Sequence, residues 1–167
     1  DKPDMVSVIG FAERIIHDIP FSKDKSLILR QLNQFEPSGG TKMLPALEMA
    51  IQRLENTESG HKHLLILSDG KSEGDFTSIL RKISTSKISV STIAVGNIAE
   101  GVLRKLAATG LGSYEHVRNA SQLPKVLVDQ VRRSQKYSVN ETIEPIISSN
   151  NPILKQITRL PELDGYL

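Results

Sequence analysis

The clearest hydrophobic pattern in the chain is a run of four apolar residues at positions 64–67, which ends at Ser68, Asp69 and Gly70. A short apolar run bounded by turn residues is typical of a strand buried on both faces, and it is too short for a helix. Such strands occur in parallel sheets covered by helices. Open α/β sheets bind ligands at the carboxyl ends of their strands, so the pattern places Asp69 at the edge where function is expected.

Strand-like and helix-like patterns alternate around this run. Strands are predicted at 5–11, 88–96 and 113–117, and a weaker one at 13–19 is closed by Pro20. The strands at 5–11 and 13–19 are expected to pair antiparallel, because their connection is too short for a helical crossover. Apolar residues recur at helical spacing in 22–35, 43–54, 76–83, 98–108 and 120–134. This alternation predicts an α/β fold with a mostly parallel sheet and helices on both faces.

The pattern changes at Tyr137. Residues 138–167 contain three Pro and several Asn and Ser, without a long periodic pattern. A strand at 139–147 and a turn of helix at 153–160 are the elements predicted there. We therefore expect one domain at 1–136 and a linker, or the start of a following domain, at 137–167.

Composition excludes several classes of function. Apolar residues make up 38% of the 167-residue chain and aromatic residues only 4%, so the core must be aliphatic. A net charge of +2 is too small to indicate binding to nucleic acid or to an anionic membrane. The absence of Cys excludes disulfides, thiolate catalysis and Cys-based metal sites. No apolar run approaches the roughly 20 residues of a membrane span. The chain opens with Asp-Lys-Pro-Asp and no Met, so we expect it to be part of a longer protein.

Two polar features converge at the carboxyl edge of the predicted sheet. The flexible loop 38–41 ends in Thr41 and opens a helix, and Asp69 follows the buried strand. A hydroxyl at a helix start and a carboxylate at a strand end can face one crevice, and such oxygen ligands suit Mg²⁺. The structural alternative is that Thr41 is a helix N-cap and that Asp69 belongs to a turn. Each residue alone favours that alternative, whereas the two together favour a shared site.

Other candidate residues lack a supporting pattern. Ser68 has no Gly-x-Ser-x-Gly motif around it and no His placed to serve it. Residues 39–42 read Gly-Gly-Thr-Lys, which is only part of a phosphate-binding loop. His61 and His63 occupy alternate positions at the entry to the buried strand and could bind a metal. A solvated strand start is the simpler interpretation of this pair.

The order of these motifs resembles a von Willebrand factor A domain. The similarity rests on Gly39-Gly40-Thr41 before a helix with Ala46-Leu47, on the run 64–70 and on the strand at 90–96. It covers about residues 4–135. The strand at 5–11 resembles the second strand of that family, and 113–117 with the following helix resembles its last strand and helix. More narrowly, the chain with its tail at 144–167 resembles large bacterial membrane proteins in which an A domain runs into a glutamine-amidotransferase-like domain.

The resemblance implies a three-layer, Rossmann-like fold with a metal-ion-dependent adhesion site. In that family the metal ligands come from an Asp-x-Ser-x-Ser loop, a Thr and an Asp. Thr41 matches the Thr and Asp69 matches the last Asp, whereas the Asp-x-Ser-x-Ser loop and the first strand before it have no counterpart here. The resemblance therefore implies an N-terminally truncated fold with a partial metal site. We expect Mg²⁺ in the intact protein and none bound by this fragment.

The missing first strand has a physical consequence. In that family it lies in the middle of the sheet, here between the strands that contain Val6 and Leu65. Its absence leaves two strand edges with unpaired N–H and C=O groups. The tail segment 139–147, a strand of a second copy or a rearranged pairing would have to fill the gap. We therefore expect the isolated chain to self-associate or repack.

The functional hypothesis is a non-enzymatic protein-interaction module that belongs to a membrane-anchored bacterial protein. The sequence leaves open on which side of the membrane the module lies, and the fragment itself is expected to be soluble. A partner protein would complete the coordination of Mg²⁺ with an acidic side chain. One alternative is a Mg²⁺-dependent enzyme that acts on phosphoryl groups. It would need a second carboxylate at a neighbouring strand end, which residues 94–97 do not supply, and nothing fixes the distance from Asp69 to Asp75. The other alternative is an architectural domain with an idle site.

Overall fold

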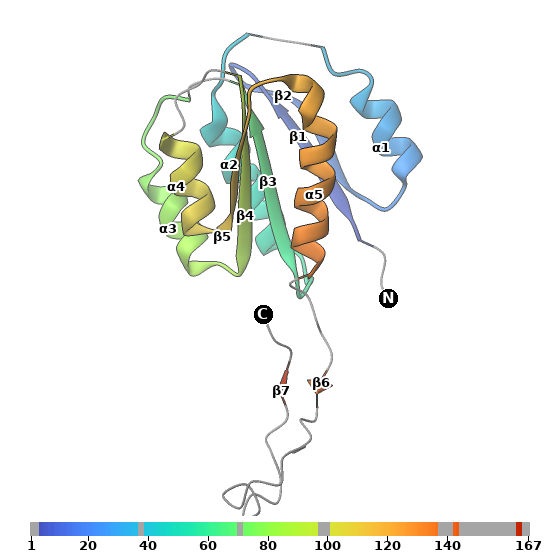
Figure 1. Ribbon diagram of the computed structural model, residues 1–167, viewed down its shortest axis with the longest axis vertical. Coiled ribbons are helices and arrows are strands. Elements are labelled where there is room, and N and C mark those ends of the chain that lie inside the picture. The colour runs from blue at the N-terminus through green and yellow to red at the C-terminus, as the bar shows by residue number, and fades with distance from the viewer. Residues whose placement is uncertain are drawn as a thin grey trace, which may run out of the picture. The chain divides into compact units, whose positions relative to one another are not determined.

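The computed structural model describes residues 4–36, 39–69, 72–96, 101–136, 142–143 and 163–164 (Figure 1). In chain order its elements are β1 (Val6–Phe11), β2 (Ile15–Ser22), α1 (Lys25–Leu32), α2 (Met43–Glu55), β3 (Lys62–Ser68), α3 (Thr77–Thr85), β4 (Ile88–Val95), α4 (Gly101–Thr109), β5 (Leu111–Val117), the 3₁₀ turn η1 (Ala120–Gln122), α5 (Leu123–Lys136), β6 (Thr142–Ile143) and β7 (Leu163–Asp164). Two compact units make up the chain, Asp1–Leu123 and Pro124–Leu167. The domain boundary at 136/137 stays a prediction.

The first unit contains a parallel three-stranded sheet in the order β3-β4-β5. Leu65 of β3 lies opposite Ser91 of β4, and Ile93 of β4 lies opposite Glu115 of β5. The helix α3 connects β3 to β4, and α4 connects β4 to β5 (Figure 1). The predicted α/β fold, with a parallel sheet flanked by helices, is confirmed.

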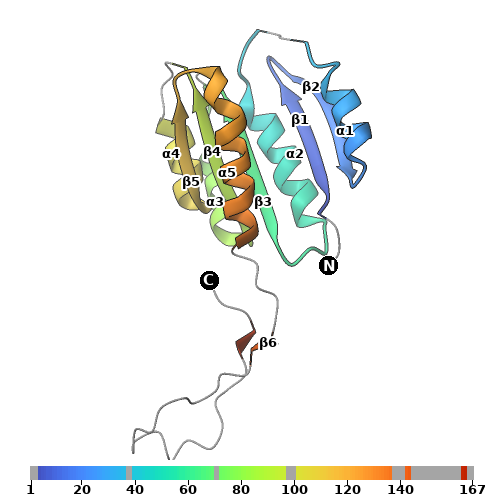
Figure 2. The ribbon, with the colours of Figure 1, turned by 45° about the vertical axis from the view of Figure 1, so that its right-hand side comes forward.

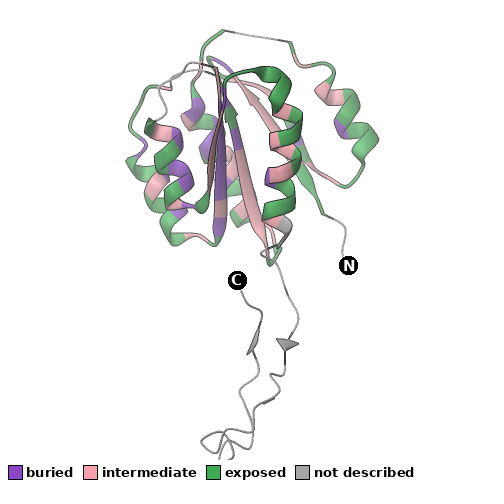
Figure 3. Ribbon diagram, viewed as in Figure 1, coloured by how far each residue is buried: buried purple, intermediate pink, exposed green. Residues whose placement is uncertain are grey.

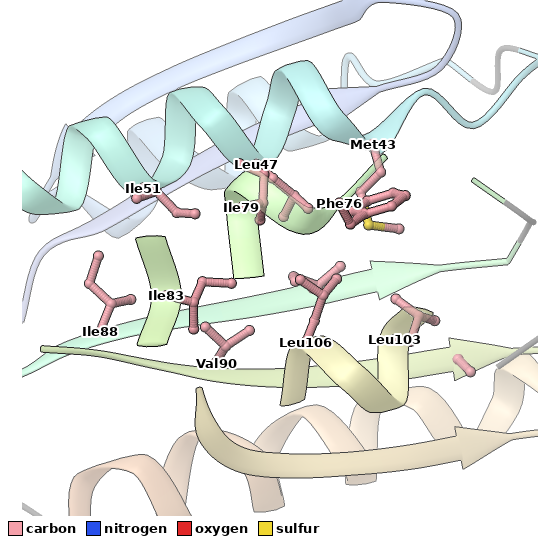
Figure 4. Close-up of a cluster of buried hydrophobic side chains, with 12 residues drawn as sticks. Met43, Leu47, Ile51, Phe76, Ile79, Ile83, Ile88, Val90, Leu103 and Leu106 are labelled. Carbon is pink, nitrogen blue, oxygen red and sulfur yellow. The ribbon is translucent and has the colours of Figure 1, made fainter. Parts of the chain in front are cut away.

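The hydrophobic core lies between this sheet and the helices α2, α3 and α4 (Figure 4). Their inward residues recur at the spacing that predicted the helices: Met43, Leu47 and Ile51 on α2, Ile79 and Ile83 on α3, and Leu103 and Leu106 on α4. Ile66 of β3 and Val90 of β4 belong to the same cluster. Burying one such side chain contributes about 1.5–3 kcal/mol. Packing in this core holds each helix against the sheet. It therefore also positions the loops that lead into the helices at the carboxyl edge of the strands.

The strand buried on both faces is β4 rather than β3 (Figure 3). Val90 and Ile93 point to opposite faces of the sheet, and both are 0% exposed. In β3, Ile66 is buried but Leu67 is 40% exposed. The run 64–67 thus predicted the strand correctly and its complete burial wrongly. The reason is that β3 pairs with only one neighbour, β4, among the strands that the structure describes.

The strands β1 and β2 form a separate antiparallel hairpin, which shares no ladder with β3-β4-β5 in the described residues. The start of α2 contacts both parts. The Lys42 N–H donates to the Ala12 carbonyl just after β1 (2.8 Å), and the Met43 N–H donates to Ser72 Oγ in the loop after β3 (3.1 Å). β1 and β3 therefore end at the same edge and run in the same direction, with α2 packed against both (Figure 2). That an additional strand belongs between β1 and β3 stays a prediction.

Two element boundaries differ from prediction for local reasons. β2 continues through Pro20 to Ser22, because β2 is an edge strand, where a missing N–H need not break a ladder hydrogen bond. α1 begins only at Lys25, since Asp24 Oδ1 accepts hydrogen bonds from the backbone N–H groups of Ser26 and Leu27 and so caps the helix there.

Some predicted elements fall partly or wholly outside the described residues. These are 98–100 of the helix predicted at 98–108, and the turn of helix predicted at 153–160. Of the strand predicted at 139–147 only β6 is described, and it pairs antiparallel with β7. Within the described ranges, no helix combines the length and the apolar character needed to cross a membrane.

Candidate functional site

The loop before α2 brings Thr41 to the carboxyl edge of β1 and β3. Thr41 is half-buried and immediately precedes Lys42, whose N–H is bonded to the Ala12 carbonyl. Lys42, not Thr41, occupies the N-cap position of α2, and no side chain makes a capping hydrogen bond there. The capping interpretation of Thr41 is therefore wrong, and the Thr41 hydroxyl is not used to start the helix.

Glu13, in the turn between β1 and β2, holds this loop from the other side. Its Oε2 lies 2.9 Å from Lys42 Nζ, in an ion pair whose side chains are 65% and 64% exposed. Gly40 has a φ of +88°, and a Cβ at this position would collide with the Glu13 side chain. The positive φ favours glycine at 40, and any larger residue would also have to displace the exposed Glu13 side chain. Sequence reasoning missed Glu13, because no local pattern links it to a loop so far along the chain.

Asp69 follows β3 directly and is exposed. In the loop after it, Ser72 accepts the hydrogen bond from the Met43 N–H. Thr41 stands two residues before Met43, and Asp69 stands three residues before Ser72. One hydrogen bond thus ties together the two loops that carry the predicted ligands, and both residues belong to the same edge of the first unit.

Two other oxygen-bearing residues near this edge, Asp75 and Ser68, are engaged or buried. Asp75 Oδ1 accepts the Thr77 N–H at 2.9 Å at the start of α3. Hydrogen bonds from the Thr77 side chain and backbone lower the pKa of Asp75, so this residue stays charged and does not suit a role as a general acid. Ser68 is only 5% exposed, which makes it a poor nucleophile for a substrate.

The number of metal-ligand donors at this carboxyl edge decides whether the described residues can bind a metal ion by themselves. Within the described ranges, no group of three or more His, Cys, Asp or Glu side chains is placed to hold a metal ion. Thr41 and Asp69 offer a hydroxyl and a carboxylate, which fit a hard cation in kind. They fall well short of the about six oxygen ligands that Mg²⁺ takes.

Comparison with known families decides where this fold belongs. The family model of the von Willebrand factor type A domain matches residues 1–130. The chain belongs to this family. Von Willebrand A (VWA) domains are typically protein-interaction modules and generally not enzymes.

Solved structures with the same fold come from distant organisms. BatB from Bacteroides thetaiotaomicron superposes with a TM-score of 0.65 at 19% identity, over 81% of this chain and 81% of that one. A von Willebrand factor type A protein from Catenulispora acidiphila superposes with a TM-score of 0.68 at 21% identity, over 81% of this chain and 35% of that one. Proximal thread matrix protein 1 of the mussel byssus was solved with zinc in its MIDAS motif. It superposes with a TM-score of 0.61 at 22% identity, over 77% of this chain and 34% of that one. At these identities the likeness shows the fold alone. No curated protein matches the chain.

Proposed function

We propose that this VWA domain is a non-enzymatic protein-interaction module whose metal site combines Thr41 and Asp69 with residues outside the fragment. The observation that carries the proposal is the Met43–Ser72 hydrogen bond (3.1 Å), which ties the helix start after Thr41 to the loop after Asp69. Thr41 does not cap its helix and Asp69 is exposed, so both can serve as oxygen ligands. Oxygen ligands of this kind fit Mg²⁺.

The interruption between β1 and β3 supports an N-terminally truncated fold. An extended segment between these parallel strands would pair with the N–H and C=O groups along both facing edges. Running in the same direction as β1 and β3, it would end at the edge that carries Thr41 and Asp69. The family resemblance puts the Asp-x-Ser-x-Ser loop at this place. We infer that a longer protein supplies this strand, and that the fragment without it self-associates through the two edges.

The interaction itself would depend on the metal. Mg²⁺ bound at this edge would offer an open coordination position to an acidic side chain of a partner protein. Thr41 would contribute its hydroxyl, and Asp69 would act through a coordinated water, as the resemblance implies. With these two donors alone, the fragment should bind Mg²⁺ negligibly. Binding of this kind needs neither a general base nor a nucleophile.

The wider context belongs to the same proposal. The tail resembles the entry to a glutamine-amidotransferase-like domain, and the VWA fold of bacterial BatB matches over most of both chains. We therefore place the domain in a larger, membrane-associated bacterial protein. No observation favours a phosphoryl-processing enzyme, since residues 94–96 at the end of β4 include no acid and Asp75 is engaged at the start of α3.

Calorimetric titration of Mg²⁺ tests the proposal. The titration compares the 167-residue chain with a version extended upstream through the preceding strand and loop. We expect negligible binding by the short chain and measurable binding by the extended one. In the extended chain, Thr41→Ala and Asp69→Ala should each weaken binding at least tenfold, a loss of about 1.4 kcal/mol. Thr57→Ala is the matched control, because Thr57 bonds to Leu54 at the far end of α2.

Three results would contradict the proposal. Tight binding by the short chain would show that the site is complete without further residues. Binding by the extended chain that ignores both substitutions would place the metal elsewhere. An extended chain that binds no Mg²⁺ at all would leave an architectural domain with an idle site.

A further inference from the structure

A pair of histidines lies at the opposite end of β3 from Asp69. His61 immediately precedes β3, and His63 is its second residue. As alternate residues they face the same side of the strand, while Leu64 and Ile66 face the core on the other side. Their rings are parallel within 4°, with centroids 6.4 Å apart.

The pair is not the solvated strand start that the sequence favoured. Both side chains are half-buried. The Nε2 atoms of His61 and His63 are both buried, and neither has a hydrogen-bond partner within the described structure. Buried polar atoms are nearly always paired, because an unpaired one loses its hydration without compensation. Two such atoms of the same type on neighbouring side chains can be satisfied by one shared partner, such as a bound ion.

The hydrogen bonds of Ser89 on β4 define which nitrogen of His63 is free to bind. Ser89 Oγ donates to the Lys62 carbonyl at 3.2 Å, so its lone pair is left to accept from His63 Nδ1 at 2.7 Å. A neutral imidazole that carries its proton on Nδ1 has a lone pair on Nε2. This arrangement, in which a partner holds the other ring nitrogen, is the one that orients metal-binding histidines.

The charge state of His63 is consistent with that role. Burial lowers the pKa of His63, and the neighbouring His61 lowers it further. A metal-binding imidazole must be neutral, and the direction of this shift agrees with the tautomer that the Ser89 hydrogen bonds favour. Protonation of either imidazole would remove its lone pair.

We propose that His61 and His63 form a binding site for a divalent transition-metal ion of the class that prefers imidazole, such as Zn²⁺, Ni²⁺ or Cu²⁺. With a metal–nitrogen distance of about 2.0–2.1 Å, the two Nε2 atoms must come within about 4 Å of each other. Ser89 holds the His63 ring, so the His61 ring turns toward it. Water completes the coordination, since within the described ranges no third His, Cys, Asp or Glu joins the pair.

This site is separate from the one at Thr41 and Asp69. His63 and Asp69 are six residues apart along β3 and its end, which at about 3.3 Å per residue corresponds to about 20 Å. The two sites also differ in chemistry, because imidazole nitrogens select softer ions than hydroxyl and carboxylate oxygens do. The histidine site needs no residue outside this chain, so it is testable on the chain as it stands.

The test is calorimetric titration of Zn²⁺ alone into the full 167-residue chain at pH 7.5. We expect about one equivalent to bind, and His61→Gln and His63→Gln each to weaken binding at least tenfold. Ser89→Ala should weaken it by about 10–100-fold, the usual loss when the residue that orients a metal-binding histidine is removed. Thr41→Ala/Asp69→Ala should bind Zn²⁺ as the unchanged chain does, which separates the two sites. His17→Gln is the matched control, since His17 stacks on Phe35 instead.

Thermal unfolding without metal shows whether each variant folds. His61 precedes β3, so its replacement should disturb folding less than that of His63. If His63→Gln fails to fold, His61→Gln alone therefore still tests whether the pair binds the metal. A folded unchanged chain that binds no Zn²⁺ would overturn the proposal. Binding that survives in the His61→Gln/His63→Gln variant, or that disappears in Thr41→Ala/Asp69→Ala, would overturn it as well.

Discussion

Arg53 of α2 and Asp18 of β2 form a two-point ion pair, with Nη1–Oδ1 at 2.7 Å and Nη2–Oδ2 at 2.9 Å. Nη1 also donates to Ser7 Oγ on β1 at 2.7 Å. In the described residues the β1–β2 hairpin shares no ladder with β3-β4-β5, so this guanidinium is an important part of what fixes the hairpin to α2. The turn of the same hairpin presents Glu13 to the loop of Thr41, which links the ion pair to the candidate site.

Replacing Arg53 should loosen the hairpin. We expect Arg53→Met, which keeps much of the alkyl chain, to lower the free energy of unfolding by about 1–2 kcal/mol, because it removes charge-assisted hydrogen bonds to Asp18 and Ser7. The stability of Arg53→Lys should fall between those of the unchanged protein and Arg53→Met, since an ammonium group keeps the charge but cannot make the two parallel hydrogen bonds to Asp18. Urea unfolding measures both. Equal stability of all three proteins would show that the pair is only a surface contact.

The same pair predicts a pH dependence. The hydrogen bond from Arg53 lowers the pKa of Asp18 below 3.8, with burial opposing in part. A carboxyl whose pKa is lower in the folded state stabilises the fold above its unfolded pKa. That contribution is lost as the pH falls through the folded value. Asp18 is 42% exposed, so solvent screening keeps the effect small.

Asp18→Asn removes this titration. Between pH 6 and pH 2, the unfolding free energy of the unchanged protein should therefore fall more than that of Asp18→Asn, as followed by urea unfolding at each pH. Parallel curves would mean that Asp18 has the same pKa in both states.

The contact between Gly40 and Glu13 predicts a contrast between neighbouring glycines. Gly40→Ala should destabilise the protein by about 1–3 kcal/mol, because it places a Cβ at positive φ and against the Glu13 side chain. Gly39→Ala is the matched control, since nothing lies within 4 Å of a Cβ there. Glu13→Ala in the Gly40→Ala background should recover part of the loss. A Gly40→Ala variant as stable as Gly39→Ala would contradict the described loop geometry.

Leu111, at the start of β5, has a φ of 52° and a side chain that is 92% exposed. A branched apolar residue gains nothing there by burial and strains the backbone. Leu111→Asn should therefore leave stability unchanged or raise it by up to about 1 kcal/mol, because Asn tolerates this conformation. Leu111→Val should lower stability. A marked loss in Leu111→Asn would show that the leucine side chain packs against something.

The core of the fold could be predicted from periodicity alone. The spacing of Met43, Leu47 and Ile51 indicated α2 and its buried face, and the apolar run at 64–67 indicated β3. What periodicity cannot show is which strands are neighbours. The exposure of Leu67 and the continuation of β2 through Pro20 both follow from edge positions, and edges are a property of the assembled sheet.

The candidate site was predictable only to the level of its elements. Parallel strands and the helix that follows a loop put Thr41 and Asp69 at one edge. The contact between Glu13 and Gly40 joins residues that are distant in sequence, so no local sequence pattern predicts it. Alternate spacing showed that His61 and His63 share a face, but burial of their Nε2 atoms depends on packing around the strand.

The most direct test of the central claim uses Mn²⁺ in place of Mg²⁺ in the upstream-extended chain, because bound Mn²⁺ broadens the NMR signals of nearby amides. Mn²⁺ is the divalent first-row ion that binds nitrogen sites least, so the histidine pair should not capture it. We predict that the amide signals of Thr41 and Asp69 broaden together at low Mn²⁺, while that of His63 is unaffected. Broadening at only one of the two, or at neither, would contradict a shared metal site.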